Sequence, residues 1–245
     1  MAGKNEALFK PFLFADQNLD DLVRDIAPRG GALADAAAQL REGNAGEAEV
    51  VITAAMMSRP DEVGAWHRLL LAAALERKGN RPGAVAALRQ LLAAAKESRI
   101  RLWTWTALRH LGEAPEPERA AAVEGLVVEV DSGRGVETLA AYADGTARYL
   151  LPGGAKFVWD APDKRLAQPI TDTLAAAGAI AADLPLGRLA GEPGPDHARV
   201  TLLTPAGPRA VEEPLADIAS PVSARGPLFA AATALLSEIL AIAKW

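Results

Sequence analysis

The sequence predicts an α+β protein, with an N-terminal α–α helical-repeat array followed by a C-terminal antiparallel β-meander sheet and two helices. Three observations predict this fold class. Apolar residues recur with a helical period between residues 33 and 111. A segment with two prolines and three glutamates, residues 113–122, then ends this pattern. After it, short apolar and aromatic runs alternate with turn residues up to residue 160.

The first half of the chain divides into helices of roughly 12–16 residues joined by short turns. Segments rich in glycine, proline and charge separate the helices at residues 42–47, 58–62 and 78–83. Each helix carries an apolar stripe of the kind that an amphipathic helix buries. The stripes are Ala48, Val51, Ile52 and Ala55; Trp66, Leu69, Leu70 and Ala73; Val85, Leu88, Leu92 and Ala95; and Ile100, Trp103, Ala107 and Leu111.

Two turn sequences in this array repeat. Gly43-Asn44 and Gly79-Asn80 are 36 residues apart (79 − 43), and at this shift Ile52 aligns with Leu88. A period near 34 residues is typical of stacked two-helix repeats. On these residues, and on small residues such as Ala48 where paired helices meet, residues 31–112 resemble the tetratricopeptide repeat. The resemblance implies a groove or helix face that binds a protein partner.

The match to the repeat family is incomplete. Leu70 stands where the family prefers a small residue, and the third unit is at most half present. Because a short stack leaves an apolar face uncovered, we expect the second half of the chain to cap it. The whole layout resembles uncharacterised bacterial proteins that pair a helical array with a small α/β domain.

The remaining sequence predicts three further segments. Residues 1–30 form an N-terminal arm and a short helix, residues 113–122 a linker, and residues 123–245 an α+β domain. The arm contains LFKPFLF at residues 8–14, which Pro11 interrupts. Its phenylalanines suit an arm that docks on this chain or on another.

The α+β domain is predicted as four strands, a helix, one or two strands and a final helix. Asp144-Gly145 is the strongest hairpin signal, because glycine accepts the positive φ of a type I′ turn. By alternation, Tyr142, Tyr149, Phe157 and Trp159 are expected to share one sheet face, either in the core or as an exposed aromatic platform. The predicted strands are 124–130, 136–143, 146–151, 155–160 and 197–204, with a short sixth at 208–213; the helices lie within 162–185 and 223–244.

Composition and motifs exclude several function classes. The net charge of −5 argues against nucleic-acid binding, which needs a basic face. The chain has no cysteine and no HExxH, P-loop, GxSxG or strand-linked GxGxxG motif, so we expect no metal, no cofactor and no enzymatic activity. The start lacks the apolar segment of a signal peptide, and the last helix is short for a membrane span, which predicts a cytoplasmic protein without membrane contact.

These observations favour a non-catalytic adaptor or scaffold that uses the helical surface to bind a protein. Trp105 lies off the apolar stripe of its helix, and it either packs against the α+β domain or the linker or is an exposed anchor for a partner. The candidate partner-binding residues are Trp105, Trp66, Arg68, Arg101, Phe12 and Phe14.

Two alternatives stay open for the second half of the chain. Meanders with flanking helices occur in profilin-like and roadblock-like folds, so the α+β domain could be a regulatory module that acts on a GTPase or binds a small ligand. The final helix places Leu228, Ala232, Leu235 and Ile239 at near-heptad spacing, which suits either a domain helix or a homodimer seam.

Overall fold

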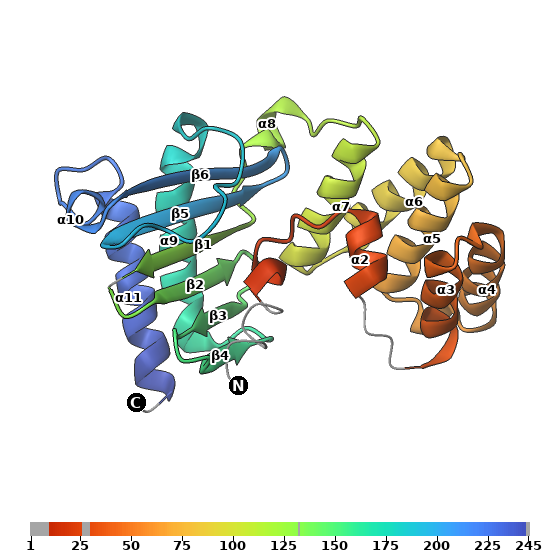
Figure 1. Ribbon diagram of the computed structural model, residues 1–245, viewed down its shortest axis with the longest axis horizontal. Coiled ribbons are helices and arrows are strands. Elements are labelled where there is room, and N and C mark those ends of the chain that lie inside the picture. The colour runs from red at the N-terminus through yellow and green to blue at the C-terminus, as the bar shows by residue number, and fades with distance from the viewer. Residues whose placement is uncertain (1–9, 26–29, 132, 244–245) are drawn as a thin grey trace. The chain divides into compact units, whose positions relative to one another are not determined.

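The computed structural model describes residues 10–25, 30–131 and 133–243 of the chain. It divides into two compact units, one formed by Asp16–Ala114 and one by the described residues of Met1–Ala15 and Pro115–Trp245. Helices occupy the first unit, and the second combines a six-stranded antiparallel sheet with helices (Figure 1). The predicted α+β class is therefore confirmed.

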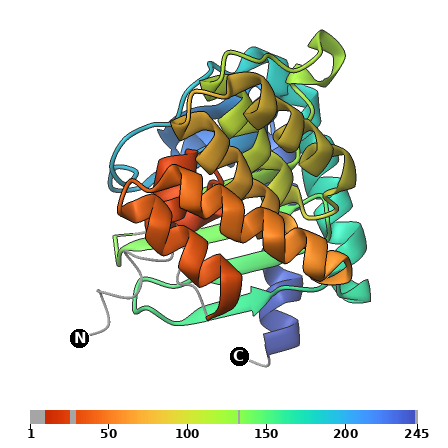
Figure 2. The ribbon, with the colours of Figure 1, turned by 90° about the vertical axis from the view of Figure 1, so that its right-hand side faces the viewer.

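The helical unit is a row of antiparallel helices in which each helix from α3 to α7 packs against the next (Figure 2). Small and aliphatic residues such as Ala36, Ala48 and Leu88 are fully buried where the helices meet. The elements are α2 (Leu19–Asp25), α3 (Gly31–Arg41), α4 (Ala45–Ser58), η2 (Pro60–Glu62), α5 (Ala65–Arg77), α6 (Arg81–Ala94) and α7 (Ser98–His110).

Three of these helices end in the same glycine turn. Gly43, Gly79 and Gly112 follow α3, α5 and α7 with φ angles of 87°, 76° and 75°. In each turn the residue after the glycine donates its N–H to a carbonyl near the end of the helix; for example, Asn80 N donates to Leu75 O at 2.8 Å. Only glycine adopts this left-handed conformation without strain, and it reverses the chain toward the next element.

The structure divides the first 30 residues differently from the sequence prediction. Helix α2 belongs to the helical unit, where Asp20 Oδ1 pairs with Arg77 Nη2 at 2.6 Å. Residues 10–15 belong to the α+β unit instead. The predicted linker contains the short helix α8 (Pro117–Ala120), and the α+β unit begins within it, at Pro115. Contacts between residues far apart in sequence decide these boundaries.

The sheet has the strand order β4-β3-β2-β1-β5-β6, and every neighbouring pair is antiparallel. The predicted hairpin at Asp144-Gly145 is present, and Gly145 N donates to Tyr142 O at 3.0 Å. Its turn is not the expected type I′, because Gly145 has a positive φ of 82° and Asp144 does not. The sixth strand is longer than predicted. The strands are β1 (Gly125–Asp131), β2 (Val136–Tyr142), β3 (Ala147–Leu150), β4 (Lys156–Trp159), β5 (His197–Thr204) and β6 (Gly207–Pro214).

One face of the sheet is apolar and is covered by α9 (Lys164–Ile180) and α11 (Gly226–Ala243), which lie on the same side in Figure 1. The near-heptad stripe of α11 is part of this core, so those side chains are used inside the unit. The short helix α10 (Leu215–Ile218) adds Ile218. The strand residues of this core are Leu126, Val128, Leu139, Ala141, Ala147, Tyr149, Ala198, Val200 and Leu202.

The predicted set of four aromatic residues on one face is wrong for Tyr142. Tyr149 pairs with Phe157 in register, and their rings stack at 6.3 Å between centroids. These two residues and Trp159 face the helices. The turn at Asp144-Gly145 pairs Ala141 with Ala147, so Tyr142 points to the opposite face because side chains alternate along a strand.

The opposite face carries a row of buried charges. Glu129 on β1, Arg199 on β5 and Glu212 on β6 are direct neighbours in register. Glu129 is 2% exposed and Arg199 is 3% exposed. Arg199 Nη2 lies 2.6 Å from Glu212 Oε2, and Arg199 Nη1 donates to Gly191 O at 2.7 Å. Buried charges are tolerated when they are paired in this way.

Residues 10–15 dock on this polar face. Lys10 in η1 (Lys10–Leu13) places its Nζ 2.8 Å from Glu129 Oε1. Tyr142 Oη donates to Leu13 O at 2.6 Å, and the Arg188 guanidinium lies 3.7 Å from the centre of the Phe14 ring. The arm was predicted to dock either on its own chain or on another. Its described part docks on its own chain.

We expect Gly79→Ala to destabilise the protein by about 1–2 kcal/mol, because alanine is strained at the positive φ of the α5 turn. No atom lies within 4 Å of the site where the new methyl group would stand, so a steric clash makes no contribution. Gly46→Ala on α4 is the control, since that glycine has equal space and no positive φ. Urea unfolding measures both; equal stabilities of the two variants would contradict the expectation.

The pH dependence of stability tests the charged row. The N–H of Gly194, which donates to Glu212 at 2.9 Å, and the Arg199 guanidinium together lower the pKa of Glu212. A carboxylate with a lowered pKa stabilises the fold above its unfolded pKa of about 4.5, and this stabilisation is lost as the pH falls further. We expect Glu212→Gln to flatten the loss of stability between about pH 5 and pH 3. The exposed control Glu118→Gln should retain the wild-type slope, and an unchanged slope in Glu212→Gln would refute the assignment.

Candidate protein-binding surface

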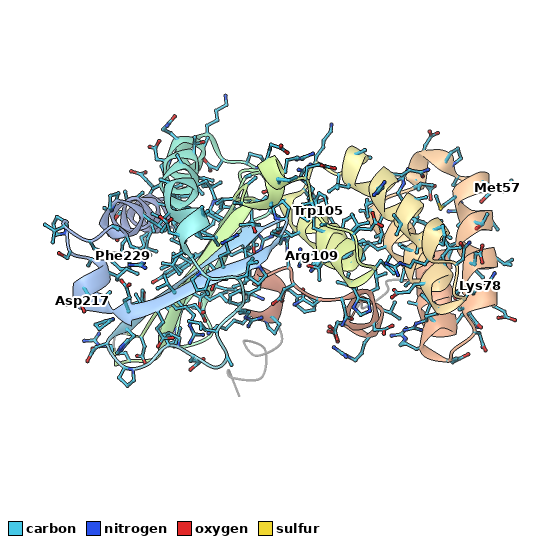
Figure 3. All side chains as sticks on the ribbon, turned by 90° about the horizontal axis from the view of Figure 1, so that it is seen from above. Met57, Lys78, Trp105, Arg109, Asp217 and Phe229 are labelled. Atoms are coloured by element: carbon cyan, nitrogen blue, oxygen red, sulfur yellow. The ribbon has the colours of Figure 1, made fainter. Side chains whose placement is uncertain are left out.

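Helix α4 is apolar on two opposite sides. Its inner side buries Ala45, Ala48 and Ile52 within the helical unit. Its outer side leaves Val50 69% exposed and Met57 79% exposed. Figure 3 labels Met57 at the outer edge of this unit. With the exposed Ala54 between them, these residues form a stripe at helical spacing, which we call the α4 surface (Val50, Ala54 and Met57).

Leaving an apolar stripe exposed to water is unfavourable in free energy. Burying a side chain of valine or methionine contributes about 1.5–3 kcal/mol, and the fold leaves this contribution unused at both ends of the α4 surface. Scattered apolar residues are common on protein surfaces, whereas aligned ones are typical of contact sites. Methionine is also well suited to binding surfaces, because its flexible thioether adapts to differently shaped partners.

A pocket of about 510 Å³ adjoins the α4 surface. It lies between the start of α3, the side of α4, and the η2 turn with the start of α5. Ala54 belongs to both the stripe and the pocket, which makes the two features continuous. The lining residues are Gly30, Gly31, Ala32, Leu33, Val51, Ala54, Ala55, Ser58, Arg59, Glu62 and His67.

Among the described lining residues, the polar side chains are few, and each has a hydrogen-bond or ion-pair partner. Arg59 Nη1 pairs with Glu62 Oε2 at 3.1 Å, and both side chains are exposed, so the pair is weak. His67 Nδ1 accepts the N–H of Gly64 at 3.2 Å. Burial and the charge of Arg68 lower the pKa of His67, so its imidazole is neutral at pH 7. Its described lining therefore presents an apolar wall with a weakly charged rim.

The two tryptophans of the sequence prediction differ in burial, and neither is fully exposed. Trp66 is half-buried and its ring centroid lies 5.4 Å from that of Trp103, whose Nε1 donates to Gln17 Oε1 at 2.7 Å. Trp105, labelled in Figure 3, is only 7% exposed, so the idea of an exposed Trp105 anchor is wrong. Helix α7 is buried on nearly all sides, and a residue off its main stripe is therefore still covered.

The other predicted residues do not gather with these tryptophans into one site. Arg68 is half-buried and lines a separate hollow of about 270 Å³ with residues of α6 and α7, and Arg101 does not line it. Phe12 is half-buried and Phe14 is buried in the α+β unit. Within the described residues, no group of three His, Cys, Asp or Glu side chains is placed to hold a metal ion.

The sequence-based prediction did not include the α4 surface, although the sequence contains a signal for it. The segment AGEAEVVITAAMMS supplies apolar residues for the buried stripe and also places Val50 and Met57 opposite it. A surface helix with one buried face ordinarily has polar residues on the other. Apolar residues on two opposite sides of the helix therefore indicated a second contact.

Shortening a side chain should affect stability differently on the two sides of α4. We expect Ile52→Ala to cost about 2–5 kcal/mol, because it opens a cavity in the helical core. Met57→Ser should change the free energy of unfolding by less than about 0.5 kcal/mol, because the side chain is exposed. Chemical unfolding of both variants checks this. A large loss in Met57→Ser would mean that the outer side is packed in solution.

Among the described helices, α11 alone has the length and apolar composition that a membrane crossing requires, and its buried stripe also serves as core.

Comparison with known proteins finds no relative: no protein-family model, curated protein or solved structure matches the chain.

Proposed function

We propose that the protein is a non-catalytic protein–protein interaction adaptor of the bacterial cytoplasm. Its helical unit, which we take to be tetratricopeptide-like, binds a partner through the α4 surface. The observation that carries the proposal is the exposure of Val50 and Met57 on a helix whose opposite side is fully packed. The proposed role is the adaptor role predicted from the sequence, but the proposed partner-binding surface is on α4 and does not include Trp105.

The partner we propose for this surface is an amphipathic helix of another protein. Such helices bind by placing apolar residues, spaced three and four apart, into an apolar groove. The stripe from Val50 to Met57 and the adjoining pocket offer a ridge and a hollow of that kind. Glu47 and Asp61 are exposed beside them, so a partner helix with basic residues flanking its apolar face fits best.

Site-specific photo-crosslinking tests this proposal. A photoreactive phenylalanine analogue is placed at Val50, at Met57 or at Val222, the last being a 93% exposed valine of the α+β unit. We expect one partner to be captured in the producing cells from positions 50 and 57 and not from position 222. Equal capture at all three positions, or none above background, would contradict the proposal.

The purified partner then allows a quantitative test by calorimetry. We expect saturable binding by the full-length protein that Met57→Asp weakens at least about tenfold, since a charge replaces an apolar contact in the interface. Val222→Asp is the matched control and should leave the affinity unchanged. An affinity that is insensitive to both Met57→Asp and Val50→Asp would place the partner elsewhere.

A further inference from the structure

A small pocket opens between the sheet and helix α11 in the α+β unit. Its volume is about 60 Å³. Strands β1, β2 and β3 form one wall, and α11 forms the other with Phe229, which Figure 3 labels. The exposed Thr233 marks its mouth. The lining residues are Val128, Val130, Glu137, Leu139, Tyr149, Phe229, Ala232, Thr233 and Leu236.

Glu137 is the one carboxylate among the described residues that line this pocket. Its Oε2 accepts a hydrogen bond of 2.5 Å from the Tyr149 hydroxyl. Burial and the neighbouring Glu137 raise the pKa of Tyr149, so the tyrosine keeps its proton and acts as a donor. The second carboxylate oxygen, Oε1, receives no hydrogen bond from any residue that the structure describes.

Glu137 differs from comparable glutamates of the same unit. Glu129 pairs with Lys10, Glu212 with Arg199 and Glu213 with Arg225 at 2.6–2.8 Å. Glu137 is half-buried, and no lysine, arginine or histidine of the described chain forms an ion pair with it. A carboxylate partly removed from water ordinarily needs a cation close by.

We propose that this pocket binds a primary ammonium group on a short aliphatic chain. The ammonium would pair with Glu137, and the Tyr149 and Phe229 rings would add cation–π attraction at its side. The methylene groups would contact Leu139 and Leu236. At about 10–15 Å³ for each water-sized group, the pocket holds roughly four to six non-hydrogen atoms. That is the size of a lysine side chain or of a small free amine.

The probe that tests the site is butylammonium, with n-butanol as the uncharged analogue. Both are titrated into the full-length protein while the methyl NMR signals of Val128, Leu139 and Leu236 are followed. We expect butylammonium to shift these signals with a dissociation constant on the order of millimolar. It should bind at least about fivefold more tightly than butanol, since only the cation pairs with Glu137. Equal binding of the two probes, or no shift with butylammonium, would overturn the proposal.

Two variants test whether the preference for butylammonium over butanol depends on the Glu137 carboxylate. Glu137→Gln preserves the shape of the side chain and removes its charge, so the preference for butylammonium over butanol should disappear. Glu238→Gln removes an exposed carboxylate from the same helix outside the pocket and should leave the preference intact. Unchanged methyl signals away from the pocket would show that Glu137→Gln is folded. A preference that survives in this folded variant would refute the role of Glu137.

A third probe distinguishes the two sources of the ammonium group. Nα-acetyl-lysine methylamide carries the same side chain on a peptide backbone. If it shifts the same signals at least as strongly as butylammonium, the site accepts a lysine of a polypeptide. If only butylammonium binds, the site accepts a free amine. Either result supports an ammonium site, and binding of neither cation excludes it.

Discussion

The α+β unit depends on the pairing of Glu129. This carboxylate lies in the middle of a central strand, and leaving a buried charge without a partner costs about 3–5 kcal/mol. Lys10 supplies the nearest cation from the N-terminal arm. Arg199 stands beside it in the sheet and is held in turn by Glu212 and by the carbonyl of Gly191. The second face of the sheet therefore requires both the arm and the loop that precedes β5.

The two sheet faces solve the problem of burial by different chemistry. The face beneath α9 and α11 excludes water with aliphatic and aromatic side chains, and the other combines paired charges with buried apolar residues such as Val127 and Leu203. Against this background the exceptions stand out. Glu137 is a half-buried carboxylate without a cation in the described chain, and Val50 and Met57 are apolar residues without a cover. We propose that at each of these places a molecule outside the chain supplies what the fold does not.

Much of the fold was predictable because its signals are local. The glycine turns at Gly43 and Gly79, the Asp144-Gly145 hairpin and the apolar periods each depend on a few neighbouring residues, and the strands and helices lie close to where they were expected. The site was less predictable, because burial depends on contacts between distant residues. The sequence around Trp105 carries no local sign that its helix is buried on nearly all sides. The charged row can be seen only once β1 and β5, which are far apart in sequence, are paired.

The bond between Tyr142 and Leu13 spans 129 residues of sequence. During synthesis on the ribosome, the arm is made long before the strands that bind it. The helical unit lies between them in sequence and makes its own contacts among residues 16–114, so it has all its parts first. Closing so long a loop is entropically unfavourable until the sheet has formed, because only then can contacts with the sheet offset the lost chain entropy. We therefore expect residues 10–15, with the apolar Leu13 and Phe14, to dock only after the sheet has formed.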